Sequence, residues 1–116
     1  MTLIKVDHSS LNDTVQNSPV LVVDVWASWC GPCLRFAPVF EAVAQGHPEV
    51  VFAKFQLDAS EANQAMADHL GVQAVPSLLL FKDGHWVDSV AGALPKAELE
   101  RMVDQLGQFQ PAAQES

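Results

Sequence analysis

Cys30 and Cys33 are the residues of this chain best suited to chemistry, and they are its only cysteines. They flank Gly31 and Pro32 in a Cys-x-x-Cys spacing. A thiolate is the nucleophile in disulfide exchange, and the unpaired N–H groups at the start of a helix favour an anion. We therefore expect Cys30, just before a helix, to attack a disulfide. Cys33, one turn deeper on the same face, can then attack the mixed disulfide and release the partner.

The same pair would make a weak structural cross-link. A ring of about 4 residues constrains the unfolded chain by about 2 kcal/mol, against ~4.7 kcal/mol for a 100-residue loop. Half of a zinc site is the alternative use, but such a site needs four ligands and the chain has no second cysteine pair. The four histidines show no ligand spacing: His8, His47, His69 and His85. We expect no metal, and no cofactor besides a redox-active Cys30–Cys33 disulfide.

A strand and a helix must position the two thiols. Residues 20–26 are apolar at every position except Asp24, which is typical of a strand covered on both faces of a parallel sheet. Apolar residues at helical spacing follow Cys33. Gly31 gives the connecting turn its conformational freedom. Pro32 fits a first helical position, where the N–H that it lacks would be unpaired.

The rest of the chain predicts one domain at residues 1–107 and a polar tail at 108–116. The patterns follow the order βαβαβαββα. The expected strands are residues 3–6, 20–26, 50–57, 77–81 and 86–91, and the expected helices are 9–16, 33–45, 60–70 and 95–107. Asp83-Gly84 is typical of a hairpin turn between the last two strands.

Hydroxyl and carboxyl side chains precede two of these helices. We expect Ser9 or Ser10 to cap the first helix, and Asp58 or Ser60 to cap the third. The apolar positions of the third helix include Ala62, Ala65, Met66 and Leu70.

The sequence Trp-Cys-Gly-Pro-Cys at residues 29–33, after a Val-Asp-x-Trp-Ala strand, resembles the thioredoxin family. The match continues through residues 75–77, 81–84 and 91–94 and covers residues 3–107. The resemblance implies the α/β thioredoxin fold, a mixed, mostly parallel five-stranded sheet with helices on both faces. It also implies a protein-disulfide reductase acting by dithiol–disulfide exchange. Its partners would be disulfide-containing substrate proteins and a thioredoxin reductase that recycles it.

Asp24 and Lys54 each stand as the one charged residue of an apolar strand. A buried carboxylate must be paired, hydrated or protonated. In the family this acid helps to deprotonate the second cysteine, so the resemblance assigns Asp24 a catalytic role and Lys54 as its partner. Two alternatives stay open. Asp24 could belong to a structural polar network, and the Lys54 amine could extend to the edge of the strand.

The resemblance assigns substrate binding to six residues: Trp29, Gly31, Pro32, Val75, Pro76 and Gly92. Trp29 should offer a flat, partly exposed surface. In the family the bond before the proline is cis and faces the disulfide, and its backbone binds an extended substrate. The alternatives are a Pro76 that serves only a turn and a Gly92 that only ends a strand.

Three positions depart from the family pattern. Leu34 and Gln73 stand where many members carry a basic residue, and Val25 replaces a frequent phenylalanine. We expect the loss of cations near the thiols to stabilise the thiolate less and to alter the surface that a reductase meets.

Charge and hydropathy limit the partners. Fourteen acidic against six basic residues give a net charge of −8, which argues against nucleic acid and against an anionic membrane surface. No apolar run approaches the length of a membrane span, and the start carries no signal-peptide pattern. We expect a cytoplasmic monomer.

A second class of function stays open. The acidic surface and the missing cations are compatible with a thioredoxin-fold interaction or co-chaperone module whose redox activity is secondary. Binding that survives replacement of both cysteines would separate this class from a reductase.

Overall fold

The computed structural model describes residues 3–110, and its elements follow the predicted order. The strands are β1 (Leu3–Val6), β2 (Val20–Trp26), β3 (Val51–Gln56), β4 (Ser77–Lys82) and β5 (His85–Ala91). The helices are α1 (Leu11–Asn17), α2 (Gly31–Gln45), α3 (Glu61–His69) and α4 (Lys96–Gln108), with a 3-10 turn at Leu57–Ala59. Of the predicted tail, residues 111–116 lie outside the described residues.

The five strands form one mixed sheet in the order β1-β3-β2-β4-β5. β2 lies at its centre, parallel to β3 and antiparallel to β4. The prediction of a mostly parallel sheet is wrong in detail, because β1–β3 and β3–β2 are parallel whereas β2–β4 and β4–β5 are antiparallel. The predicted tight turn at Asp83 and Gly84, whose φ angles of 52° and 81° fit a two-residue hairpin, accounts for the antiparallel pairing of β4 with β5.

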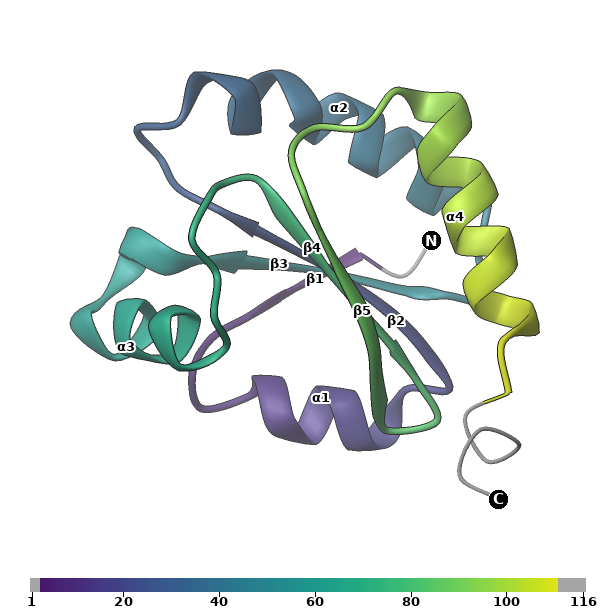
Figure 1. Ribbon diagram of the computed structural model, residues 1–116, viewed down its shortest axis with the longest axis horizontal. Helices are drawn as coiled ribbons and strands as arrows, with labels where there is room; N and C mark the ends of the chain where they lie inside the picture. Colours follow the sequence, from purple (N-terminus) through teal and green to yellow (C-terminus); the bar gives the residue numbers. More distant parts are fainter. Residues whose placement is uncertain (1–2, 111–116) are drawn as a thin grey trace.

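Helices cover both faces of this sheet, as predicted. Figure 1 shows α1 and α3 on one face and α2 and α4 on the other. Side chains that alternate along β2 serve the two faces in turn. Leu21 and Val23 join the core cluster under α1 and α3, whereas Val22 packs with α2 and α4. Within residues 3–110 no helix is both long and apolar enough to cross a membrane.

The helix caps partly follow the prediction. Ser60 caps α3, since its Oγ accepts a hydrogen bond from the Asn63 N–H at 3.0 Å. Ser10 precedes α1 but makes no side-chain cap. Instead the Asp7 carboxylate accepts the N–H groups of Ser9 and Ser10 at 2.8 and 3.0 Å. The predicted serine cap of α1 is therefore wrong, because the Ser10 Oγ accepts the Asp7 N–H at 3.0 Å and caps no N–H of α1.

The buried face of α3 also differs from the prediction. Ala62 and Ala65 are exposed, whereas the polar Asn63 is 3% exposed. The Asn63 side chain accepts the His8 N–H at 2.9 Å and donates to the Gln56 carbonyl at 2.9 Å. Asn63 is buried because it satisfies backbone groups of the segments after β1 and in β3.

Candidate active site

The two cysteines form a disulfide at the N-terminus of α2. Cys30 is the N-cap residue, and its Sγ accepts the Cys33 N–H at 3.1 Å. The Cα atoms of the two cysteines are 5.3 Å apart. Gly31 and Pro32 are the first two residues of α2. The first sulfur thus lies where unpaired helix N–H groups and the positive end of the helix dipole favour a thiolate, as the sequence predicts.

Both sulfurs are shielded, the second more than the first. Cys30 is 5% exposed and Cys33 is 1% exposed. This order agrees with an outer nucleophile and an inner resolving thiol. The Cys30 Sγ lies 3.7 Å from the Val75 carbonyl oxygen, which places the loop before β4 against the disulfide.

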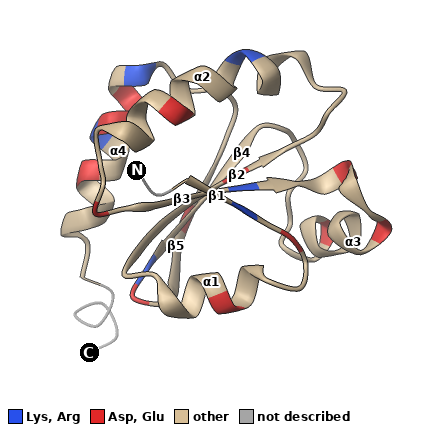
Figure 2. Ribbon diagram, turned by 180° about the vertical axis from the view of Figure 1, so that it is seen from behind, with Lys and Arg blue, Asp and Glu red and all other residues tan. Residues whose placement is uncertain are grey.

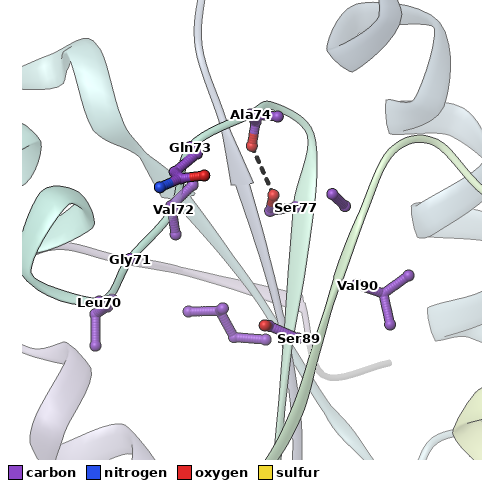
Figure 3. A pocket seen from close by; sticks show the side chains of 10 residues that line it. Leu70, Gly71, Val72, Gln73, Ala74, Ser77, Ser89 and Val90 are labelled. Atoms are coloured by element: carbon purple, nitrogen blue, oxygen red, sulfur yellow. Dashed lines mark hydrogen bonds between the residues drawn. The ribbon is translucent and has the colours of Figure 1, made fainter.

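That loop carries the cis bond that the family resemblance implies, between Val75 and Pro76. Two hydrogen bonds fix it. The Ser77 Oγ donates to the Ala74 carbonyl at 2.6 Å, as Figure 3 shows beside a pocket of about 260 Å³. The Gly92 N–H donates to the Pro76 carbonyl at 2.8 Å. Gly92 has φ +98°, a backbone conformation that favours glycine.

Trp29 is 70% exposed beside this loop, which agrees with a contact surface. The residue before it, Ser28, is held by Asp58, which the sequence suggested only as a possible cap of the third helix. Asp58 accepts the Ser28 N–H at 3.1 Å and also a short hydrogen bond from the Ser28 hydroxyl. These two bonds hold the pKa of Asp58 below its ordinary value.

Asp24 is fully buried at the centre of the sheet. Neither of its carboxylate oxygens has a hydrogen-bond partner among the described residues. Burial raises the pKa of Asp24 to about 7, and the charge of Lys54 opposes that rise only in part. Asp24 can therefore gain and lose a proton near neutral pH.

Lys54 is the register partner of Asp24 on β3, so the sequence prediction of neighbouring strands is confirmed. The two side chains nevertheless form no ion pair; within residues 3–110 the one ion pair links His47 and Asp104. The Lys54 Nζ lies 4.7 Å from the centroid of the Trp26 ring instead. Lys54 therefore acts on Asp24 through its charge and not through a direct ion pair, because its ammonium group lies over the aromatic face.

Of the three positions that depart from the family pattern, two are exposed and one is buried. Leu34 and Gln73 are exposed near the disulfide and near Val75, and neither carries a charge. Val25 is buried in β2. Among the described residues, no group of three or more His, Cys, Asp or Glu side chains could hold a metal ion.

Three comparisons with known proteins all find thioredoxins. Residues 2–105 match the family model described as Thioredoxin. The chain is 40% identical to a thioredoxin of Staphylococcus saprophyticus over 104 residues, which cover 90% of this chain and 97% of that protein. It is 37% identical to thioredoxin 1 of Synechococcus elongatus over 98 residues, which cover 84% and 90%. A solved mutant thioredoxin from Halobacterium salinarum aligns with a TM-score of 0.82 at 32% identity and 95% coverage of each chain.

Proposed function

The chain belongs to the thioredoxin family, and from this premise we propose how its residues reduce the disulfide bonds of other proteins. It is a thiol–disulfide oxidoreductase whose redox-active pair is Cys30 and Cys33. The observation that carries the proposal is the contact of the Cys33 N–H with the Cys30 Sγ at the start of α2. In the dithiol state that N–H can stabilise a Cys30 thiolate.

The first step is attack on the substrate disulfide. The Cys30 thiolate attacks one sulfur, the substrate S–S bond breaks, and a mixed disulfide forms. The departing substrate sulfur leaves as a thiolate and takes a proton from solvent. The helix dipole lowers the energy of the attacking thiolate, which raises its population at neutral pH.

The second step releases the substrate. Asp24 accepts the proton of the Cys33 thiol, and the Cys33 thiolate attacks the Cys30 sulfur. The mixed disulfide breaks, the second substrate sulfur leaves as a thiolate, and two electrons have moved to the substrate. A pKa of about 7 suits Asp24 to this proton transfer. Lys54 helps by opposing the rise of that pKa.

We propose that an extended substrate segment lies along the loop at Val75 and beside Gly92. Its side chains would enter a groove of about 590 Å³ lined by Trp29, Leu57, Gln64, Asp68, Val72, Gln73, Ala74 and Val75. The α3 helix beside this groove carries acidic residues and neither Lys nor Arg, as Figure 2 shows. This charge favours substrates with basic residues near their disulfide.

Three further features complete the proposal. A thioredoxin reductase returns the Cys30–Cys33 disulfide to the dithiol. The protein works as a monomer, which is supported by one chain supplying both cysteines, Asp24 and the substrate loop. It works in the cytoplasm, which is supported by a single redox cysteine pair and no further cysteine in the sequence.

The test is the reduction of insulin disulfides with dithiothreitol as the electron source. We expect the protein to accelerate the reaction, and both Cys30→Ser and Cys33→Ser to abolish the acceleration. Cys33→Ser should also accumulate covalent complexes with substrate, because the resolving thiol is missing. Equal activity in Cys30→Ser would refute the assignment.

A folded wild-type protein with free thiols that gives no acceleration would favour the interaction module. Trp29 and Leu34, 70% and 54% exposed, would then be the first residues to test for redox-independent binding.

A further inference from the structure

Arg35 reaches back over the active-site turn. It stands four residues after Gly31 on α2, and long helical side chains lie over the turn that precedes them. An ideal Cβ on Gly31 would lie 3.2 Å from the Arg35 Nη1 and 4.0 Å from its Cζ. The guanidinium thus lies in tight contact with the position that a Cβ on Gly31, the residue after Cys30, would take.

Within the described part of the chain, no carboxylate forms an ion pair with this guanidinium. The one ion pair within residues 3–110 joins His47 and Asp104, on another part of the molecule. Leu34 and Gln73, two exposed positions where many family members carry a basic residue, hold no charge in this chain. The chain as a whole has a net charge of −8, which opposes the formation of a thiolate.

We propose that Arg35 is a positioning and tuning residue that stabilises the Cys30 thiolate by its charge. The inference rests on the proposed function, in which that thiolate is the nucleophile. Gly31 contributes to this stabilisation, because its missing side chain leaves room for the Arg35 guanidinium. A cation near a thiol favours the charged form, and in this chain Arg35 supplies the cation from the residue after Leu34.

The experiment measures the pH dependence of alkylation of Cys30 by iodoacetamide in a Cys33→Ser background. Arg35→Gln should raise the pKa of Cys30 by about 0.5 unit, which lowers the alkylation rate below the pKa about threefold. Arg35→Lys should restore most of the rate. Arg101→Gln, on exposed α4 surface, is the control for the loss of one positive charge. Molar salt should shrink the difference between Arg35→Gln and the parent.

Gly31→Ala provides the second arm. Its Cβ would push the guanidinium by a few tenths of an ångström, so any change that it makes in the pKa of Cys30 should be smaller in Arg35→Gln than in the parent. Equal pH profiles for Arg35→Gln and its parent, or an equal effect of Arg101→Gln, would overturn the inference. Insulin reduction by the wild type separates the two proposals. If the wild type reduces insulin and Arg35→Gln leaves the pH profile of Cys30 alkylation unchanged, only the role of Arg35 fails. If Arg35→Gln shifts that pH profile but the wild type does not reduce insulin, only the proposed function fails.

Discussion

Asp24 and Lys54 face each other in register across two parallel strands, yet the ammonium group lies over Trp26 and the carboxylate has no hydrogen-bond partner among residues 3–110. A buried carboxylate in this position is stable mainly in its protonated form, and its pKa is raised to about 7. The same arrangement therefore destabilises the fold when the group ionises and supplies a proton acceptor near neutral pH.

The first prediction concerns stability. Below pH 3.8 Asp24 is protonated in both the folded and the unfolded protein. Between pH 3.8 and about 7 the unfolded chain releases the proton and the folded protein keeps it, so the free energy of unfolding falls as the pH rises. The difference is on the order of 4 kcal/mol. Asp24→Asn should therefore match the wild type near pH 4 and be more stable above pH 7.

Urea unfolding of the oxidised protein from pH 4 to pH 8.5 measures this difference. Glu41→Gln, an exposed carboxylate on α2, is the control and should leave the pH dependence unchanged. A stability gap between Asp24→Asn and the wild type that is the same at every pH would contradict the raised pKa.

The second prediction concerns the release of substrate. Asp24→Asn removes the proton acceptor for Cys33 but leaves Cys30 in place. Formation of the mixed disulfide should keep its rate, whereas its resolution near pH 7 should slow by roughly 100-fold, the lower end of general-base effects. Rapid quenching with acid followed by mass spectrometry measures both steps. Equal slowing of both steps would show that Asp24 acts on the fold of the site and not on proton transfer.

The sequence predicted the parts of the site that lie on regular elements. The cysteine turn, the buried acid and the strand pairing of Asp24 with Lys54 follow from apolar runs and helix signals, which are local. The direction of the Lys54 amine depends on the Trp26 ring of a neighbouring strand. The choice between these two partners is set by side-chain packing, which the local sequence pattern does not predict.

The contact of Ser28 with Asp58 is a second feature that local sequence patterns do not predict. These residues are 30 positions apart; Ser28 lies in the loop after β2, and Asp58 lies in the 3-10 turn at Leu57–Ala59. The register of Trp26 with Gln56 places them opposite each other two residues later. A correct register could therefore have identified the pair, but apolar periodicity alone leaves the register open. Asn63 was missed because a polar residue on a short helix is expected to face solvent.

The third prediction concerns Gly92. At φ +98° a side chain is strained although an added Cβ would meet no atom within 4 Å. Gly92→Ala should cost about 1–2 kcal/mol of folding free energy and weaken the contact of this residue with Pro76, raising KM for insulin. Thermal unfolding and steady-state kinetics measure the two effects.

Gly107→Ala is the matched control, since Gly107 lies in α4 with open space around it and no positive φ. It should leave KM unchanged and the stability equal or slightly increased. A Gly92→Ala protein as stable as this control would contradict the role assigned to the backbone conformation.

The fourth prediction concerns the carboxylate that holds Ser28. Asp58 accepts both the N–H and the hydroxyl of Ser28, and an amide can accept only on its oxygen. Asp58→Asn should loosen the loop that carries Trp29, accelerate hydrogen exchange of the Ser28 N–H and lower kcat/KM roughly threefold. Asp13→Asn, exposed on α1, should change neither quantity. Unchanged exchange at Ser28 in Asp58→Asn would show that the loop is fixed by other contacts.

The last prediction concerns His47, which joins the end of α2 to α4. Its Nδ1 lies 2.9 Å from the Val43 carbonyl and its Nε2 lies 3.0 Å from the Asp104 carboxylate, so only the doubly protonated ring satisfies both acceptors. Partial burial lowers the pKa of His47, but these two acceptors outweigh it and raise the pKa above its ordinary value.

A group whose pKa is raised by folding stabilises the protein fully below its unfolded pKa, here 6.5, and this stabilisation is lost as the pH rises through the folded pKa. Asp104 is 65% exposed, so the pair contributes a fraction of about 1 kcal/mol. Asp104→Asn should lower the pKa of His47 in an NMR titration and reduce stability at pH 5.5 but not at pH 9. In a His47→Gln background the same substitution should have no pH-dependent effect, because the titrating ring is gone. A stability loss of equal size at both pH values would show that Asp104 acts through packing and not through its charge.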